Sequence, residues 1–142
     1  MKNERHRARE FALQGLYQWQ LAQTDPATIA RELGEARGFD KIDAAYFRDL
    51  LQGALAARAQ LENEIARHLD RELERLSPVE RSILLLAGYE LAHHPEIPFR
   101  VIVNEAVELA KAYGGTDGYR FVNGVLDKLA ARLREGEVKA LS

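Results

Sequence analysis

Apolar residues recur every three or four positions along most of the chain, which is the spacing of the buried face of an amphipathic helix. The alternation with a period of two that predicts half-buried strands is absent. The four prolines and most of the ten glycines fall where one apolar stretch ends and the next begins. The pattern therefore predicts an all-α fold.

Three helices are predicted in the first half of the chain, over residues 3–23, 26–36 and 44–69. The apolar side of the first helix consists of Ala8, Ala12, Leu16 and Trp19. Within that side, Gly15 leaves room for a close neighbour. Asp25 and Asp43 are the expected caps of the second and third helices. The third helix is so long that we expect a bend near Gly53 or Ala59.

The clearest helix start in the chain is formed by Ser77, Pro78 and Glu80. Serine is a good cap, proline suits the first helical position, and a glutamate at this spacing completes a capping box. The helix that begins at Pro78 is apolar around most of its circumference as far as the break at residues 93–95. Such a helix is enclosed by others, so we expect it to be the centre of the core.

Two more helices are predicted over residues 99–113 and 116–134. Between them lie Gly114 and Gly115, where a left-handed backbone costs least and a helix ends easily.

A length of 142 residues fits one domain. Within it we expect residues 1–76 and residues 77–135 to form two packed three-helix groups. Residues 136–142 carry mixed charge and are predicted to be a frayed tail.

Composition narrows the classes of function. The chain has 20 Lys and Arg against 22 Asp and Glu, a net charge of −2, so any affinity for nucleic acid must come from local asymmetry. The absence of cysteine excludes disulfides, thiol nucleophiles and thiolate metal sites. No apolar run approaches the roughly 18 residues that a membrane span needs, so we expect no membrane partner and a cytoplasmic location.

Candidate catalytic groups are poorly arranged. The four histidines are His6, His68, His93 and His94, and for the adjacent pair Ile97 and Pro98 stand at the i+4 positions where a helical metal site would have a ligand. Glu105 and Glu108 share a helix face with Lys111, which indicates a solvated charged stripe. We therefore expect a non-enzymatic protein that has no metal ion and no cofactor.

The beginning of the chain is locally cationic. Four basic residues, Lys2, Arg5, Arg7 and Arg9, stand with a single acidic residue, which gives a local charge of +3. Arginine makes bidentate contacts with phosphate and stacks on bases, so the segment is a candidate phosphate-binding element. A solvated basic tail is the alternative.

Two aromatic residues lie off the predicted core faces. A rotation of about 100° per residue puts Tyr17 away from the apolar side of the first helix, and Phe121 beside Arg120 away from the apolar side of the last. Exposed rings beside cations suit the stacking of unpaired bases, which favours single-stranded RNA as the ligand. For Phe121 the alternative is a half-buried ring at the edge of the core.

Four segments that cover nearly the whole chain carry a family resemblance. They read RHRAREFALQGLYQWQL, YFRDLLQG, VERSILLLAGYEL and IPFRVIVNEAVELAKAYGGTDGYRFVNGVLDKLA. Together they resemble the NusB family of transcription antitermination factors. The resemblance implies an all-α pair of three-helix bundles. It also implies binding, together with NusE, a ribosomal small-subunit protein, to the boxA element of nascent ribosomal RNA leaders, which lets RNA polymerase in the antitermination complex pass terminators.

The resemblance also assigns roles to residues. The family's RNA-binding positions correspond to Arg5, Arg7, Arg9, Tyr17, Asp117 and Phe121, to which we add Lys2 and Arg120. Its glutamate early in the central helix corresponds to Glu80, which we assign to partner binding. His6 departs from the pattern, because some relatives have arginine there, and a neutral His6 removes one charge from the segment.

Two other interpretations stay open. In one, the chain is a purely protein-binding helical module that docks through Glu80, Glu105 and Glu108, and its helix flanks also allow a homodimer. In the other, the chain resembles the NusB-like domain of RNA methyltransferases, but the sequence ends at Ser142 with no cofactor domain, so we expect the antitermination factor.

Overall fold

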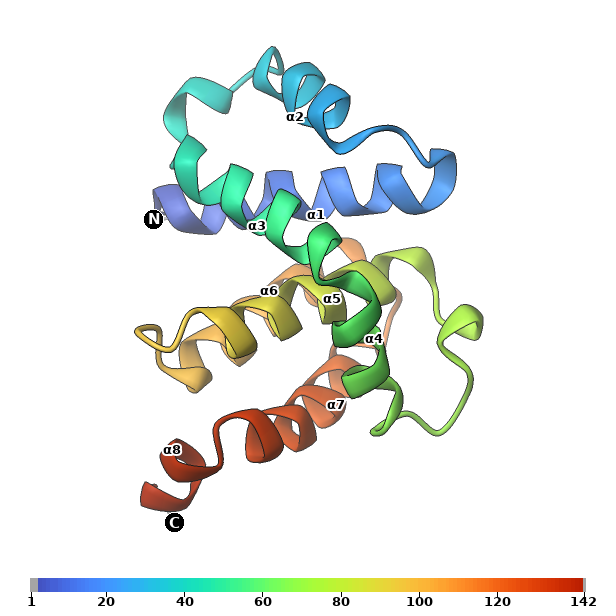
Figure 1. Cartoon of the computed structure of the whole chain (residues 1–142), viewed down its shortest axis with the longest axis vertical. Coiled ribbons are helices and arrows are strands. Elements are labelled where there is room, and N and C mark those ends of the chain that lie inside the picture. Colours follow the sequence, from blue (N-terminus) through green and yellow to red (C-terminus); the bar gives the residue numbers. More distant parts are fainter. Residues whose placement is uncertain (1–2, 142) are drawn as a thin grey trace.

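The computed structural model describes residues 3–141, and these residues form helices joined by short turns (Figure 1). The α-helices are α1 (Glu4–Ala22), α2 (Pro26–Gly34), α3 (Ala44–Ala56), α4 (Arg58–Ala66), α5 (Pro78–His93), α6 (Phe99–Tyr113), α7 (Gly118–Leu133) and α8 (Glu135–Ala140). Two short 3-10 helices are η1 (Phe39–Lys41) and η2 (Leu73–Arg75). The all-α prediction is therefore confirmed.

The predicted caps determine where three helices begin. The side chain of Asp25 accepts a hydrogen bond from the backbone N–H of Thr28 at the start of α2, and Asp43 accepts one from Tyr46 at the start of α3. Ser77 does the same for the N–H of Glu80 in α5. Each cap satisfies a donor that the first turn of a helix leaves unpaired.

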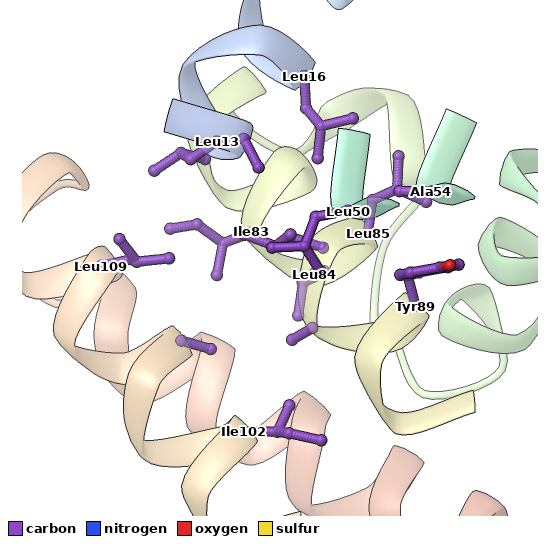
Figure 2. Packing of buried hydrophobic residues seen from close by; sticks show 14 of the residues in the cluster. Leu13, Leu16, Leu50, Ala54, Ile83, Leu84, Leu85, Tyr89, Ile102 and Leu109 are labelled. Carbon is purple, nitrogen blue, oxygen red and sulfur yellow. The ribbon is translucent and has the colours of Figure 1, made fainter. Parts of the chain in front are cut away.

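Helix α5 is the centre of the core, as its sequence predicts. All residues from Ser82 to Leu91 are buried, and α1, α3, α4, α6 and α7 all pack against α5. Figure 2 shows Ile83, Leu84 and Leu85 meeting leucines from α1, α3 and α6. The buried hydrophobic cluster includes residues from both predicted halves of the chain, and the boundary between residues 76 and 77 stays a prediction.

Two glycines allow helices to approach closely. A methyl group added at Gly15 would lie 2.9 Å from Leu51 Cδ1 and 3.2 Å from Ile29 Cγ2, so α1 needs a small residue there, as predicted. A methyl group at Gly53 would overlap the ring of Tyr89 on α5. These contacts fix α1 and α3 against their neighbours.

Three local expectations are wrong. Residues 44–69 are not one bent helix: the backbone leaves helical geometry at Ala57, so that α3 packs on α1 while α4 packs on α5 and α7. Gly114 is extended, with φ −92° and ψ −177°, rather than left-handed. The end of the chain forms helix α8 through residue 140 instead of a frayed tail.

Helix α8 is held by a buried arginine that precedes it. Arg134 donates hydrogen bonds to the backbone carbonyls of Leu91, His94 and Ile97, at 2.8, 2.8 and 3.0 Å, and so neutralises the negative end of α5. It also pairs with Glu137 at 2.6 Å, and Glu137 accepts a bond from the N–H of Phe99. The tail is thus ordered by contacts with distant residues.

Candidate nucleic-acid interface

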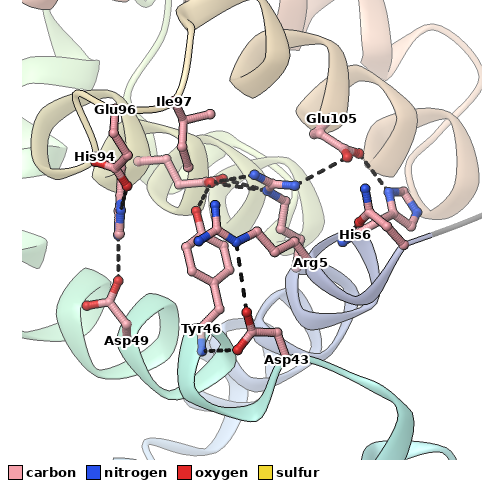
Figure 3. Close-up of polar contacts among 12 residues, drawn as sticks. Arg5, His6, Asp43, Tyr46, Asp49, His94, Glu96, Ile97 and Glu105 are labelled. Atoms are coloured by element: carbon pink, nitrogen blue, oxygen red, sulfur yellow. Dashed lines mark hydrogen bonds and ion pairs between the residues drawn. The ribbon is translucent and has the colours of Figure 1, made fainter.

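The predicted basic segment forms the first turns of α1, which separates its arginines in space. Neighbours two positions apart on a helix point about 200° apart, so Arg5 and Arg7 face different sides. Arg7 is exposed and makes no ion pair within the described residues. Arg5 is half-exposed, lies 3.9 Å from Asp43 and places its guanidinium 4.4 Å from the ring centre of Tyr46 (Figure 3). Lys2 lies outside the described residues.

Arg9 is buried, and the prediction that it projects outward to phosphates is wrong. Its side chain is 4% exposed and donates three hydrogen bonds to Glu90 of α5, at 2.9 to 3.1 Å, and one to Glu105 of α6 at 3.2 Å. The hydroxyl of Tyr46 on α3 also donates to Glu90. Arg9 therefore joins α1 to α3, α5 and α6. Its hydrogen bonds are made within the protein, so its guanidinium is not available to phosphate.

Charge and burial shift the pKa values in this cluster. Burial alone would lower the pKa of Arg9, but the hydrogen bonds and negative charge of Glu90 outweigh it, and the pKa is raised. Burial, then the charge and hydrogen bond of Glu90, raise the pKa of Tyr46. Both groups keep their protons at neutral pH, so the cluster is a fixed structural element.

His6 and Glu105 tie the same end of α1 to α6. The Nδ1 atom of His6 lies 2.6 Å from Glu105 Oε2, and its Nε2 atom lies 4.0 Å from Glu10 Oε1 (Figure 3). Because Glu105 is shared between His6 and Arg9, it is unsuited to the docking role that the sequence suggested. Glu108 is exposed.

Tyr17 is exposed, as the helix geometry predicts, at 37% of its surface. It borders a recess of about 400 Å³ between α1, the start of α5 and the end of α6. The lining residues are Glu10, Phe11, Leu13, Gln14, Tyr17, Val79 and Tyr113. The hydroxyl of Tyr113, which also lines the recess, donates a 2.7 Å hydrogen bond to Glu10. The recess combines apolar walls with a few polar groups, which is typical of binding sites.

Glu80 packs against Gly118 where α7 begins. A Cβ atom added to Gly118 would lie 2.6 Å from Glu80 Oε2, so the Glu80 carboxylate occupies the place that a side chain would fill. Glu80 comes from the first turn of α5, beside Val79 of the recess. Asp117 is exposed and lies 3.8 Å from Arg120.

Phe121 is half-buried and packs against the core, which agrees with the edge-of-core alternative. The guanidinium of Arg71 lies 5.0 Å from its ring centre. Arg120, the predicted neighbouring cation, is 73% exposed. The cation over the ring is therefore Arg71, which the sequence did not indicate, rather than the neighbouring Arg120.

His94 packs against Tyr46, which belongs to the cluster of Arg9 and Glu90. His94 Nε2 lies 2.5 Å from Asp49 and Nδ1 lies 2.7 Å from Glu96, while the rings of Tyr46 and Tyr89 contact it (Figure 3). Burial lowers the pKa of His94, but the hydrogen bonds and charges of Glu96 and Asp49 outweigh burial and raise it.

We expect His94→Gln to cost more stability at pH 5.5 than at pH 8. A pKa raised by folding stabilises the protein fully below the ordinary value of about 6.5, and this contribution is lost as the pH rises through the raised value. Urea denaturation of both proteins at the two pH values measures the difference. An equal cost at both values would show that the charge of His94 contributes nothing.

Taken together, the site belongs to a helical binding protein. Among residues 3–141, no group of three or more His, Asp or Glu side chains is placed to hold a metal ion, and no helix is long and apolar enough to cross a membrane. What the described surface offers is exposed arginine, exposed tyrosine and a largely apolar recess. These features define an adaptor that binds macromolecules.

Comparisons with known proteins identify the family. The model of the NusB family matches residues 6–131. The transcription antitermination protein NusB of Nitrosomonas eutropha is 56% identical over 98% of this chain and 83% of its own length, and that of Ralstonia nicotianae is 54% identical over 98% and 90%. The chain belongs to the NusB family.

Solved structures agree with this assignment. The structure of T. maritima NusB superposes with a TM-score of 0.83, at 35% identity and 92% coverage of both chains. A structure of the antitermination factors NusB and NusE in complex with dsRNA gives 0.84, at 29% identity, with 93% of this chain and 99% of that chain covered. Family membership makes this chain a transcription antitermination protein and not an enzyme.

Proposed function

We propose that this protein acts in the cytoplasm together with NusE, binding the boxA element of nascent ribosomal RNA leaders so that RNA polymerase reads through terminators. The observation that carries the proposal is that α1 exposes Arg7 and the ring of Tyr17. An arginine that is not used within the protein is available to a phosphate, and an exposed ring is available to an unpaired base. The related NusB that was solved with NusE in complex with dsRNA supports NusE and RNA as partners.

The contacts divide between two kinds of surface. Lys2, Arg5 and Arg7 would hold phosphates, while Tyr17 would stack on a base. We assign NusE to Glu80 and the adjoining recess of about 400 Å³, which is apolar enough to accept side chains of a protein, and we leave the Tyr17 edge of the recess to RNA. Asp117, Arg120 and Phe121, the other predicted RNA contacts, lie around the start of α7, where Glu80 packs against Gly118.

A module that binds protein alone is the second candidate, and the recess favours it. Titrating boxA RNA with this protein, with and without NusE, separates the two. In our proposal the protein alone binds single-stranded RNA and NusE strengthens the complex. RNA binding by NusE alone, unchanged when this protein is added, would support the second candidate. A boxA duplex tests the preference for unpaired RNA.

Salt should weaken RNA binding moderately. Because Arg9 is occupied by Glu90, about three cations remain at the beginning of the chain, and together they contribute about −2 to the slope of the logarithm of affinity against the logarithm of salt concentration. From these contacts alone the affinity should fall about 20-fold between 50 and 200 mM salt. Filter binding across this range measures the slope, and an affinity independent of salt would contradict the proposed phosphate contacts.

A further inference from the structure

The three arginines of the basic segment differ in how far the protein itself uses their charge. Arg9 is fully engaged by Glu90, whereas Arg7 is exposed and makes no ion pair within residues 3–141. Arg5 lies between these extremes. Its side chain is 48% exposed, and the one ion pair that it makes within the described part of the chain is with Asp43.

The carboxylate of Asp43 is held beside the first turn of α1 by contacts that do not involve Arg5. The backbone N–H of Asp43 donates a 3.3 Å hydrogen bond to the carbonyl of Glu4. Oδ1 of Asp43 accepts a 3.0 Å hydrogen bond from the N–H of Tyr46, which is the cap of α3. The other oxygen, Oδ2, is left facing Nε of Arg5 (Figure 3). The negative charge is therefore a fixed part of the surroundings of Arg5.

The separation between Arg5 and Asp43 allows attraction but no hydrogen bond. Nε and Oδ2 lie 3.9 Å apart, whereas a hydrogen bond between such groups needs about 2.7–3.2 Å. The ring of Tyr46, 4.4 Å from the guanidinium, supports Arg5 from one face without using its N–H groups. Arg5 therefore keeps its donors available to an RNA phosphate while its charge is partly offset by Asp43.

A second acidic residue adds to the negative charge near Arg5. The pKa of Glu96 is lowered, first by its hydrogen bond with His94 and, to a smaller extent, by the positive charge of Arg5. The side chain of Glu96 is 58% exposed, so its charge is screened more strongly than that of Asp43, which is 34% exposed. Asp43 is thus the main competitor for the charge of Arg5.

We propose that Asp43 competes with RNA phosphate for Arg5 and so holds down the affinity of this protein for RNA. The inference rests on the proposed function. A phosphate that binds Arg5 comes close to the carboxylate of Asp43, and the repulsion between the two anions offsets part of its attraction to the guanidinium. Because backbone contacts carry no sequence information, weakening them gives base contacts, such as the one proposed for Tyr17, a larger share of the binding.

Removing the charge of Asp43 tests the proposal. Asp43→Asn keeps the cap of α3, because asparagine is as good an N-cap as aspartate. We expect its affinity for single-stranded boxA RNA, measured by filter binding with NusE present at 50 mM salt, to rise about two- to five-fold, the range for one exposed ion pair. The gain should be smaller at 200 mM salt, which screens the charge. Asp43→Ser also keeps a cap and should give the same gain.

Asp25→Asn is the matched control. Asp25 caps α2 as Asp43 caps α3, by accepting a hydrogen bond from the N–H of Thr28 at 3.3 Å. It follows the opposite end of α1 from Arg5, and the 19 residues of α1 span about 28 Å. Asp25→Asn should therefore leave the affinity for RNA unchanged. Thermal unfolding of the three variants verifies that each is folded.

Combined variants show whether Asp43 acts through Arg5. The gain from Asp43→Asn should disappear when Arg5 is already replaced by glutamine, and it should persist when Arg7 is replaced instead. A gain that persists without Arg5 would show that Asp43 repels RNA by itself, and this would overturn the proposal. A gain with boxA RNA but not with a scrambled RNA of the same length would also overturn it, because that result indicates a base contact.

The outcomes also separate this proposal from the one on which it rests. If Arg5→Gln weakens RNA binding and Asp43→Asn leaves it unchanged, the competition is wrong and the proposed function stands. Weaker RNA binding by folded Asp43→Asn would show that Asp43 positions Arg5 for RNA, which is the opposite of competition. If the unaltered protein with NusE does not bind RNA, both proposals fail.

Discussion

Replacing Glu90 by glutamine should lower the free energy of unfolding by about 3–5 kcal/mol, because breaking a buried ion pair leaves a buried charge without its partner. The side chains of Glu90 and Arg9 are 2% and 4% exposed, and glutamine has nearly the same shape as glutamate, so the loss reports charge rather than packing. Chemical denaturation measures it as a lower midpoint with an unchanged slope.

The control for this prediction is an ion pair on the surface. Glu135 and Lys139 lie 2.7 Å apart and are 64% and 74% exposed, so Glu135→Gln should leave the denaturation midpoint almost unchanged. A midpoint for Glu90→Gln equal to that of the unaltered protein would contradict the structural role of the cluster.

The cluster around Glu90 shows where reasoning from the sequence stopped. Arg9 precedes Leu16 by seven residues, and Glu90 follows Ile83 by seven, so each lies within about 20° of a core position on its own helix. That spacing was a usable signal that both are buried. Their pairing was not predictable, because it depends on how α1 crosses α5, and no local pattern determines a contact between residues 81 positions apart.

Local signals did determine much of the fold. The caps Asp25, Asp43 and Ser77 and the all-round hydrophobicity of α5 were enough to place the helix starts and the centre of the core. Helix α8 was missed because a short isolated helix is unstable in water and depends on tertiary contacts. Here those contacts are made by Arg134 with the end of α5, and by Glu137 with the start of α6.

The candidate site, like the fold, was predictable from the sequence only where a single helix determines it. Helix geometry correctly placed Tyr17 at the surface, because only the orientation of one helix was needed. The recess beside Tyr17 was missed, because it is formed by helices far apart in the sequence.

Replacing Tyr17 by alanine should reduce the affinity for single-stranded boxA RNA by about 1–3 kcal/mol, which is roughly 5- to 150-fold, if the ring stacks on a base. The loss of stability should be small, because Tyr17 is exposed and no hydrogen bond of its side chain is seen within the described residues. Filter binding at one fixed salt concentration, with thermal unfolding of the same samples, measures both quantities.

Tyr17→Phe is the matched control, because it keeps the ring and removes only the hydroxyl. It should bind RNA almost as the unaltered protein does, since stacking uses the face of the ring. Normal RNA binding by Tyr17→Ala together with weaker binding of NusE would assign Tyr17 to the partner that fills the recess. A large drop in thermal midpoint would instead show that the ring supports the packing of Phe11 and Val79 around the recess.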